Sequence, residues 1–251
     1  LHLLSRRQRQ MCIRDRIRGA LKSVPYFKFK QGICRLPLYG GGRERKPMSE
    51  KAMTIVYEVG NSLYVNLTNK CPCSCTFCIR QNGDGAYGSD SLWLEHEPSA
   101  EEIKDALKKA GFKKYNEIIF CGYGEPTERI DILVLTAEFI KKNGGPPVRL
   151  NTNGLSDLIN KKPTAHMLEG RVDTVSISLN AGTMEEYIKV TRPSFGEEAF
   201  YAMQEFASEC KKYVDNVVFT VVDVIGEEEL NASRMLADKL GIRLRIRKYE
   251  S

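Results

Sequence analysis

Long apolar runs are absent from this chain of 251 residues, because no stretch approaches the roughly 18 apolar residues that a membrane span needs. No low-complexity tract is present either, which argues against a fibre or a long disordered tail. The first residues lack the apolar segment of a secretory signal, so we expect none. With 42% hydrophobic and 28% charged residues, the composition is that of a globular protein with a full-sized core.

Histidine is also scarce. Of the three in the chain, only His96 and His166 lie beyond residue 52, and neither belongs to a catalytic constellation. Cysteine is more informative, because four of the eight cysteines fall within eight residues, at positions 71, 73, 75 and 78. Cysteines so close together cannot all form disulfides without strain, so the cluster predicts a metal site. We therefore expect a reducing, cytoplasmic compartment.

The positive charge is concentrated at one end of the chain. Residues 1–52 hold 14 basic and three acidic side chains, which leaves 24 basic and 29 acidic ones for residues 53–251. The basic segment resembles a mitochondrial transit peptide in composition, but residues 11–16 (MCIRDR) resemble a translated adapter remnant. We expect residues 1–52 to be a poorly structured basic leader, with Met53 as the native start. No nucleic-acid partner and no membrane partner are then expected for residues 53–251.

Beyond residue 52, extended segments alternate with helical ones. Strands are predicted over residues 62–68, 117–121, 148–151, 172–179, 216–224 and 242–246, and helices after Ser99 and over residues 132–142, 197–213 and 230–240. Ser99 followed by Glu102 is a capping-box signature. The alternation implies parallel strands with right-handed crossovers. Because a closed barrel needs eight strands, we expect an α/β fold, a partial (βα)6 TIM-like barrel with ligands at the carboxyl ends of its strands.

The cysteine cluster directly follows the first of these strands. Structural zinc usually takes two separated pairs of cysteines, and no second pair is found here. Four thiols on one short loop suit a polynuclear iron cluster better. Zinc and inert buried cysteines are the alternatives at this point.

Three of the four cysteines carry a family resemblance. Cys71, Cys75 and Cys78 stand at the spacing C-x3-C-x2-C, with Phe77 before the last cysteine, and this resembles the signature loop of the radical S-adenosylmethionine (SAM) superfamily. The resemblance implies that these three cysteines hold a 4Fe-4S cluster, and that SAM chelates its open iron through the methionine amino and carboxylate groups. Cys73 is extra to the pattern, either a bystander or an alternative ligand.

Other strand ends agree with this resemblance. Residues 122–125 (GYGE) resemble the superfamily's GGE motif, with Tyr123 in place of a glycine, and residues 152–154 (TNG) resemble another of its elements. Arg192 is either a carboxylate clamp or a solvated arginine, and Ser178 and Asn180 either contact SAM or are satisfied inside the barrel. The SAM contacts that the resemblance implies are Phe77, Gly122, Tyr123, Gly124, Glu125, Thr152, Asn153, Ser178, Asn180, Arg192 and Val224.

Within the superfamily, residues 61–93 and the strings FCGYGEPT, LNTNG and VSISLNA look like the TatD-linked group of radical SAM proteins. The resemblance implies an enzyme whose 4Fe-4S cluster reductively cleaves SAM to a 5′-deoxyadenosyl radical, which abstracts hydrogen from an unknown substrate. That substrate is a small molecule or a partner protein, and flavodoxin or ferredoxin is the kind of electron donor expected. The alternatives are a radical activase and a non-catalytic zinc or iron-sulfur protein. Residues 81–98 form a long loop, expected to be a lid, a partner surface or a packed cover for Trp93.

Overall fold

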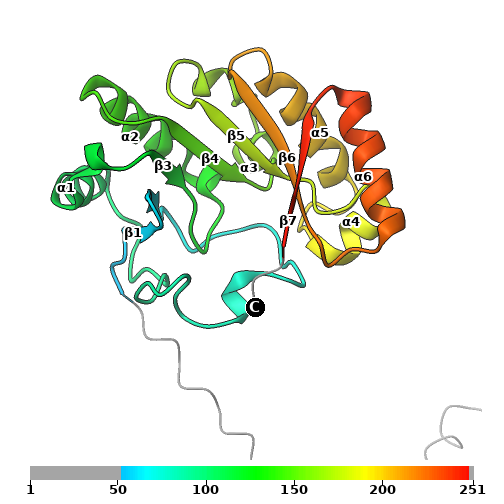
Figure 1. Cartoon of the computed structure of the whole chain (residues 1–251), viewed down its shortest axis with the longest axis horizontal. Coiled ribbons are helices and arrows are strands. Elements are labelled where there is room, and N and C mark those ends of the chain that lie inside the picture. The colour runs from blue at the N-terminus through cyan, green and yellow to red at the C-terminus, as the bar shows by residue number, and fades with distance from the viewer. Residues whose placement is uncertain (1–51, 249–251) are drawn as a thin grey trace, which may run out of the picture. The chain divides into compact units, whose positions relative to one another are not determined.

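The structure is a computed structural model in which residues 52–248 are described (Figure 1). The basic leader expected over residues 1–52 lies outside the described residues except for Ala52. One sheet of seven strands follows the order of the chain: β1 (Val56–Val59), β2 (Ser62–Val65), β3 (Glu117–Phe120), β4 (Val148–Thr152), β5 (Thr174–Ser178), β6 (Asn216–Val222) and β7 (Arg243–Arg247). β1 pairs antiparallel with β2, and β2 to β7 are parallel throughout. The sheet does not close, which confirms the predicted partial TIM-like barrel.

Helices connect the parallel strands. They are α1 (Ala100–Ala110), α2 (Ile130–Lys142), α3 (Ser156–Asn160), α4 (Met184–Thr191), α5 (Glu198–Cys210) and α6 (Glu227–Leu240), with short 3-10 helices η1 (Ile79–Gln81), η2 (Phe112–Lys114), η3 (Pro126–Arg129) and η4 (Ala165–Leu168). The capping box of α1 forms as predicted, because the Ser99 hydroxyl accepts from the Glu102 N–H while the Glu102 carboxylate accepts from the Ser99 N–H at 2.8 Å. No helix within residues 52–248 has the length and apolarity needed to cross a membrane.

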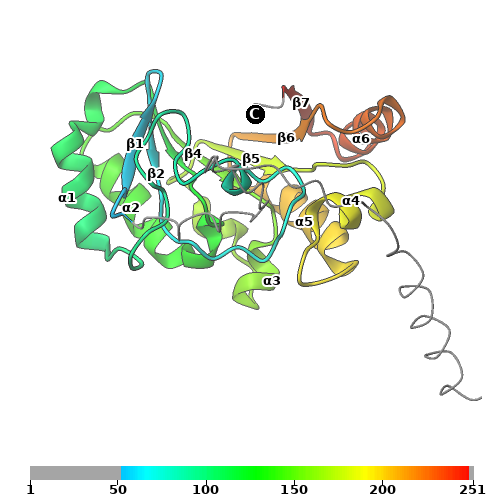
Figure 2. The same cartoon turned by 90° about the horizontal axis from the view of Figure 1, so that it is seen from below.

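The two faces of the sheet differ in polarity, because successive side chains of a strand point to opposite faces. Apolar residues of each strand, such as Leu150 and Ile177, enter the main core, and α2, α3 and α5 lie along that side (Figure 2). The opposite side, here called the inner face, carries the alternate residues. On the parallel strands these are Ser62, Tyr64, Glu117, Ile119, Arg149, Asn151, Thr174, Ser176, Ser178, Asn216, Val218, Thr220, Val222, Arg243, Arg245 and Arg247.

The short helix α3, the 3-10 helices, β1 and α4 were not predicted, and the last two bear on the site. β1 forms a hairpin with β2 through Gly60, whose φ of 57° is in the left-handed region that favours glycine. α4 begins after Thr183, whose hydroxyl accepts from the Glu186 N–H. Both elements are short, so neither shows a sustained apolar period in the sequence.

Candidate metal and cofactor site

The cysteine loop, residues 66–78, starts at the end of β2 and reaches the segment that follows α4. The N–H of Ser74 donates to the Thr191 carbonyl at 3.0 Å, and the N–H of Ser194 donates to the Pro72 carbonyl at 2.8 Å. The loop therefore ties the region after β2 to the region after β5. This fixes its backbone across the carboxyl ends of the parallel strands, the edge at which ligands of such folds gather.

The four cysteines of the loop have different surroundings. Cys73 is buried in the main core, whereas Cys71, Cys75 and Cys78 are half-buried. Hydrogen bonding with the Cys73 thiol lowers the pKa of both Cys71 and Cys75, and the Asn153 amide donates to the Cys73 sulfur at 3.8 Å. The lowered pKa favours the thiolate form, which is the form that binds metal.

These thiols fit an iron-sulfur cluster by their chemistry and placement. Within residues 52–248, no three His, Cys, Asp or Glu side chains converge as the ligands of a single ion do. Cluster cysteines bind different irons, so they need no such convergence. Three half-buried thiols on one anchored loop are therefore a donor set that a 4Fe-4S cluster accepts.

Arg80 is a candidate residue that the sequence analysis missed. Its Nε donates to the Cys78 sulfur and its Nη2 to the Cys73 carbonyl, both at 3.3 Å. The guanidinium also lies 5.9 Å from the centroid of the Trp93 ring. The charge of Arg80 also acts to lower the pKa of Cys71 and of Cys75. The only sequence signal is an arginine two residues after the last cysteine of the spacing, which is too common a pattern to identify alone.

The turn after β3, residues 121–125, packs directly on the start of the cysteine loop. A Cβ atom at Gly124 would lie 2.2 Å from the Thr68 carbonyl oxygen, which leaves no room for any side chain. The N–H of Glu125 donates to the Lys70 carbonyl at 2.8 Å. Gly124 is therefore required by close approach of two backbones.

The Glu125 carboxylate is buried, 4% exposed, and is held by donors of its own chain. Its Oε1 accepts from the Thr127 N–H and hydroxyl at 3.1 and 2.8 Å and from the Thr152 hydroxyl at 2.7 Å. Its Oε2 accepts from the Asn153 N–H at 2.8 Å. Burial raises the pKa of Glu125, and these hydrogen bonds act against that rise. The carboxylate thus joins the ends of β3 and β4, and its contact with the SAM amino group stays a prediction.

Tyr123, which replaces a glycine of the GGE pattern, turns its side chain to the loop 79–98. Its hydroxyl donates to the carbonyls of Gly83 and Gly85 at 2.7 and 3.0 Å. Its ring packs edge-on against Trp93, with centroids 5.0 Å apart. With Tyr57 and Leu92, Tyr123 belongs to a second, smaller core. The tyrosine therefore anchors the loop over the turn that carries Glu125.

The other residues predicted to contact SAM lie further along. Phe77 is partly buried against the main core. Ser178 ends β5, and Asn180 is buried with a φ of 62°. Arg192 is exposed at the end of α4, and Val224 is 47% exposed beyond β6. Hydrogen bonds bring Thr152 and Asn153 together with Glu125, whereas Ser178 ends β5, and Asn180 and Val224 follow β5 and β6.

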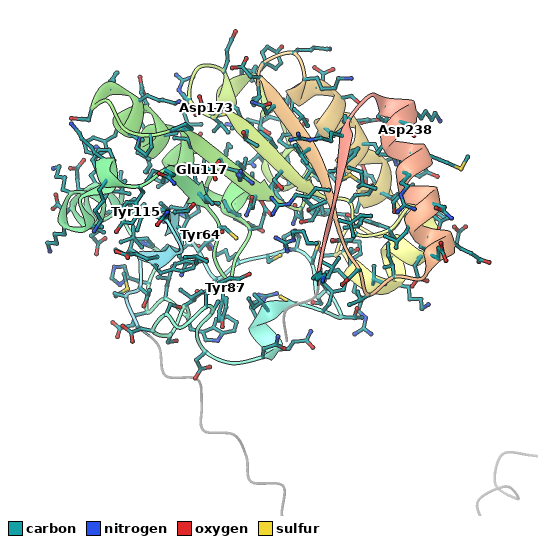
Figure 3. The ribbon with its side chains drawn as sticks, viewed as in Figure 1. Tyr64, Tyr87, Tyr115, Glu117, Asp173 and Asp238 are labelled. Atoms are coloured by element: carbon teal, nitrogen blue, oxygen red, sulfur yellow. The ribbon has the colours of Figure 1, made fainter. Side chains whose placement is uncertain are left out.

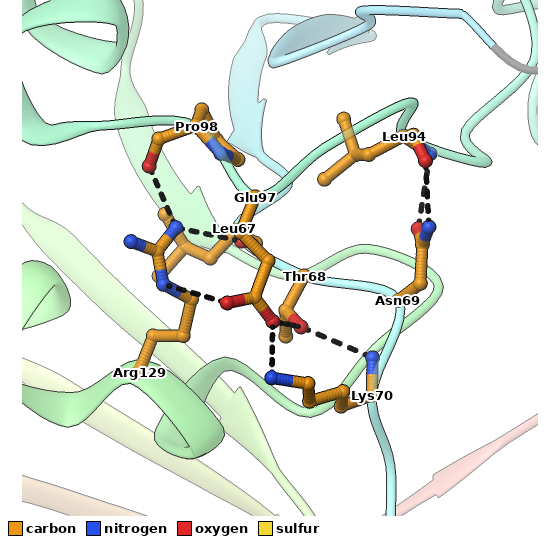
Figure 4. A network of polar contacts seen from close by, with 8 residues as sticks. All are labelled: Leu67, Thr68, Asn69, Lys70, Leu94, Glu97, Pro98 and Arg129. Carbon is orange, nitrogen blue, oxygen red and sulfur yellow. Dashed lines mark hydrogen bonds and ion pairs between the residues drawn. The ribbon is translucent and has the colours of Figure 1, made fainter.

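A polar network supports the cysteine loop from the other side (Figure 4). Glu97 accepts from the Thr68 hydroxyl at 2.8 Å and forms ion pairs with Lys70 at 3.0 Å and Arg129 at 3.7 Å. The guanidinium of Arg129 also donates to the Leu67 carbonyl at 3.2 Å. These residues fix the segment that leads into Cys71. The sequence gives no signal for them, because each is an ordinary polar residue of a loop or a short helix.

The fold is a partial TIM-like barrel with a cysteine loop at the carboxyl ends of its parallel strands. The sequence model of the Radical SAM superfamily matches residues 65–234, so the chain belongs to that superfamily. Its members use a 4Fe-4S cluster and SAM, and the chain is an enzyme of this class.

Individual relatives cover part of the chain. It is 27% identical over 142 residues to a GTP 3′,8-cyclase of Rhodococcus opacus, covering 53% of this chain and 36% of the relative. It is 31% identical over 144 residues to one of Corynebacterium glutamicum, covering 53% and 34%. The chain thus spans about a third of the length of these curated relatives.

Solved structures share the fold. Streptococcus suis SuiB bound to S-adenosylmethionine superposes with a TM-score of 0.56 at 17% identity, over 75% of this chain and 40% of that one. A radical SAM methyltransferase from Sphaerobacter thermophilus has a TM-score of 0.51 at 14% identity, over 77% and 68%.

Proposed function

We propose that residues 53–251 form a radical SAM core domain in which Cys71, Cys75 and Cys78 hold the 4Fe-4S cluster. The observation that carries the assignment is the separation of the four cysteines by burial: Cys73 is 3% exposed in the core, while the other three are half-buried on the loop. When bound, the cluster and SAM supply one-electron cleavage of SAM to methionine and a 5′-deoxyadenosyl radical that abstracts hydrogen from the substrate.

The protein's own part is to hold and shield. Arg80 donates to Cys78, and Asn153 to Cys73, so both keep the loop sulfurs oriented. Glu125 clamps the ends of β3 and β4 next to the loop. The loop 79–98, anchored by Tyr123, covers this edge and limits access of water. We assign the SAM contacts to Phe77, to the turn 122–125, and to Thr152, Asn153, Ser178, Asn180, Arg192 and Val224. Phe77 lies on the cysteine loop, Arg192 caps α4, and the others end or follow strands.

The test is anaerobic reconstitution, followed by iron and sulfide analysis and measurement of 5′-deoxyadenosine after reduction with dithionite. We expect Cys71→Ala, Cys75→Ala and Cys78→Ala each to abolish 5′-deoxyadenosine formation. Cys73→Ala is the matched control, because it removes a thiol of the same loop, and it should retain cleavage. One equivalent of zinc with no cleavage would instead establish the structural metal-binding alternative.

We further propose that the chain is of the TatD-linked group, on the strength of the motifs quoted above, and that it works in the cytoplasm with a flavodoxin or ferredoxin as donor. Six cysteines of residues 52–248 are free thiols, which suits a reducing compartment. The assay for the subgroup is incubation with GTP under turnover conditions. We expect no GTP consumption, and consumption of GTP coupled to 5′-deoxyadenosine formation would place the enzyme with the cyclases instead.

A further inference from the structure

The inner face of the sheet carries a line of arginines that the proposed cluster site does not use. Arg243, Arg245 and Arg247 alternate along β7 with Leu244, which packs against the main core. Residues at i, i+2 and i+4 of a strand share one face at about 6.6 Å intervals. The three guanidinium groups are therefore stacked along the inner side of the barrel, and all three residues are exposed.

Among the described residues, these arginines have no acidic partner. Within residues 52–248, no ion pair or side-chain hydrogen bond is formed by Arg243, Arg245 or Arg247. Arg149, on the same face, pairs with Glu117 at 2.9 Å, and Glu117 lies on the sheet in Figure 3. It is the single carboxylate among the inner-face residues of the parallel strands. In the part of this face that the structure describes, Arg149, Arg243, Arg245 and Arg247 therefore have one carboxylate between them. By contrast, Lys189 and Lys212 on the helix surfaces each form an ion pair with a glutamate three residues earlier in the chain.

A cavity of about 260 Å³ lies among these residues. Its lining combines three cations with three neutral hydrogen-bonding groups and one apolar side chain: Arg149, Arg243, Arg245, Thr174, Ser176, Asn216 and Val218. Arginine presents a planar fork of donors that matches the oxygens of a phosphate or carboxylate. Hydroxyl and amide groups next to such a fork complete the hydrogen bonding of a bound anion. The cavity has the size and chemistry for an anionic head group.

The line of arginines also runs toward the proposed radical site. The cavity lies against the first residues of β5, β6 and β7, while Arg247 ends β7. Burial raises the pKa of Tyr64 and of Cys121, and the charge of Arg247 acts against both rises, so Arg247 lies near the ends of β2 and β3. Cys121 begins the turn that carries Glu125. An anion held in the cavity would therefore extend its remaining atoms toward that edge.

We propose that Arg243 and Arg245 bind the phosphate or carboxylate group of the substrate in this cavity, with Arg247 further along β7 toward the proposed radical site. This inference rests on the proposed function, which makes the inner face the substrate side of the enzyme. The substrate class is then an organic anion, and arginines of β7 select it.

The experiment is isothermal titration calorimetry of the reconstituted full chain with two probes, inorganic pyrophosphate and citrate, at low ionic strength. We expect at least one probe to bind, with affinity about 10-fold to 100-fold lower in Arg245→Gln. Arg245→Lys should recover part of it, because it keeps the charge and loses the fork. The matched control is Arg234→Gln on α6, an exposed arginine bonded to Asn231 at 2.7 Å, which should bind like the wild type. Circular dichroism verifies that each variant folds.

The results distinguish a phosphate from a carboxylate substrate, and they test the β7 anion site separately from the proposed radical SAM function. Loss of pyrophosphate binding in Arg245→Gln assigns a phosphate substrate, and loss of citrate binding assigns a carboxylate. Absence of binding by both probes, or equal weakening by Arg234→Gln, overturns the inference. Because calorimetry does not depend on SAM cleavage, binding without 5′-deoxyadenosine formation refutes the proposed function alone, and cleavage without binding refutes the inference alone.

Discussion

Replacing Glu125 by glutamine tests whether its carboxylate works as an internal clamp. In the wild type, Oε1 accepts from the Thr127 N–H and Oε2 accepts from the Asn153 N–H. A glutamine presents one oxygen, which accepts hydrogen bonds, and one NH2 group, which donates them. In either orientation of the amide, the NH2 group therefore faces the backbone N–H of Thr127 or of Asn153, and that N–H is left without an acceptor. The hydroxyls of Thr127 and Thr152 can rotate to suit the amide, but a backbone N–H cannot.

The expected loss of stability follows from this single unpaired N–H group. A buried donor without an acceptor costs about 1–3 kcal/mol, and the remaining bonds lose their charge-assisted strength. The variant also gains some stability, because a neutral glutamine is less costly to bury than a charged glutamate. We expect a net destabilisation of about 2 kcal/mol, which corresponds to a fall in Tm of about 4–8 °C for a domain of this size.

The assay is thermal unfolding of the full chain at pH 7 by circular dichroism. Glu128→Gln is the matched control, because it makes the same change three residues away on a half-buried side chain that forms no hydrogen bond or ion pair within residues 52–248. Its Tm should stay within about 2 °C of the wild type. The reasoning is refuted if Glu125→Gln melts at or above the wild-type temperature, or if both variants lose the same stability. A normal KM for SAM in Glu125→Gln would also show that its carboxylate does not bind the amino group.

Three further changes test the supports of the site. Tyr123→Phe removes the hydroxyl that holds Gly83 and Gly85, so limited proteolysis should cut residues 79–98 faster than in the wild type, and unchanged protection would contradict the anchoring role. Gly124→Ala places a Cβ on the Thr68 carbonyl, so iron per chain after reconstitution should fall. Gly226→Ala is the comparison, because no atom lies within 4 Å of the added Cβ and its φ of -61° is open to any residue. The Ser99 capping box lowers the pKa of Glu102 to about 2, so its stabilisation is complete above the ordinary value of 4.5 and is lost as the pH falls toward 2. The Tm difference between the wild type and Glu102→Gln should therefore be largest near pH 7 and shrink below pH 4, and a difference that grew with acidity would disprove it.

The sequence was sufficient to predict the features whose signals come from residues close together in the chain. The six parallel strands follow from apolar segments separated by capped helices, and the capping box at Ser99 is a pattern of four residues. Cys71, Cys75 and Cys78 were found because their spacing lies within one loop. Each of these signals joins residues that are close in the chain.

The partners of the polar side chains could not be predicted in this way. Glu97 meets Lys70 and Arg129 from separate segments of the chain, and nothing local marks it. Similarly, residues 243–247 read as a strand with alternating arginines, but their relation to the cavity depends on the curvature of the whole sheet. Pairings of this kind depend on tertiary placement, which sequence periods do not contain.

Tyr123, which stands in place of a glycine of the GGE pattern, holds the long loop 79–98. A glycine leaves the surface of the turn bare, whereas the buried Tyr123 ring provides a platform on which Trp93 packs. The loop is further held by Asn66, whose amide donates to the Leu92 carbonyl at 2.8 Å, and by Asn69, which bonds to both backbone groups of Leu94. Attachments at this many points oppose an opening lid, since each would have to break. The loop is better explained as a fixed cover than as a lid, and the proposed β7 anion site is consistent with this because it lies on the inner face, away from the loop.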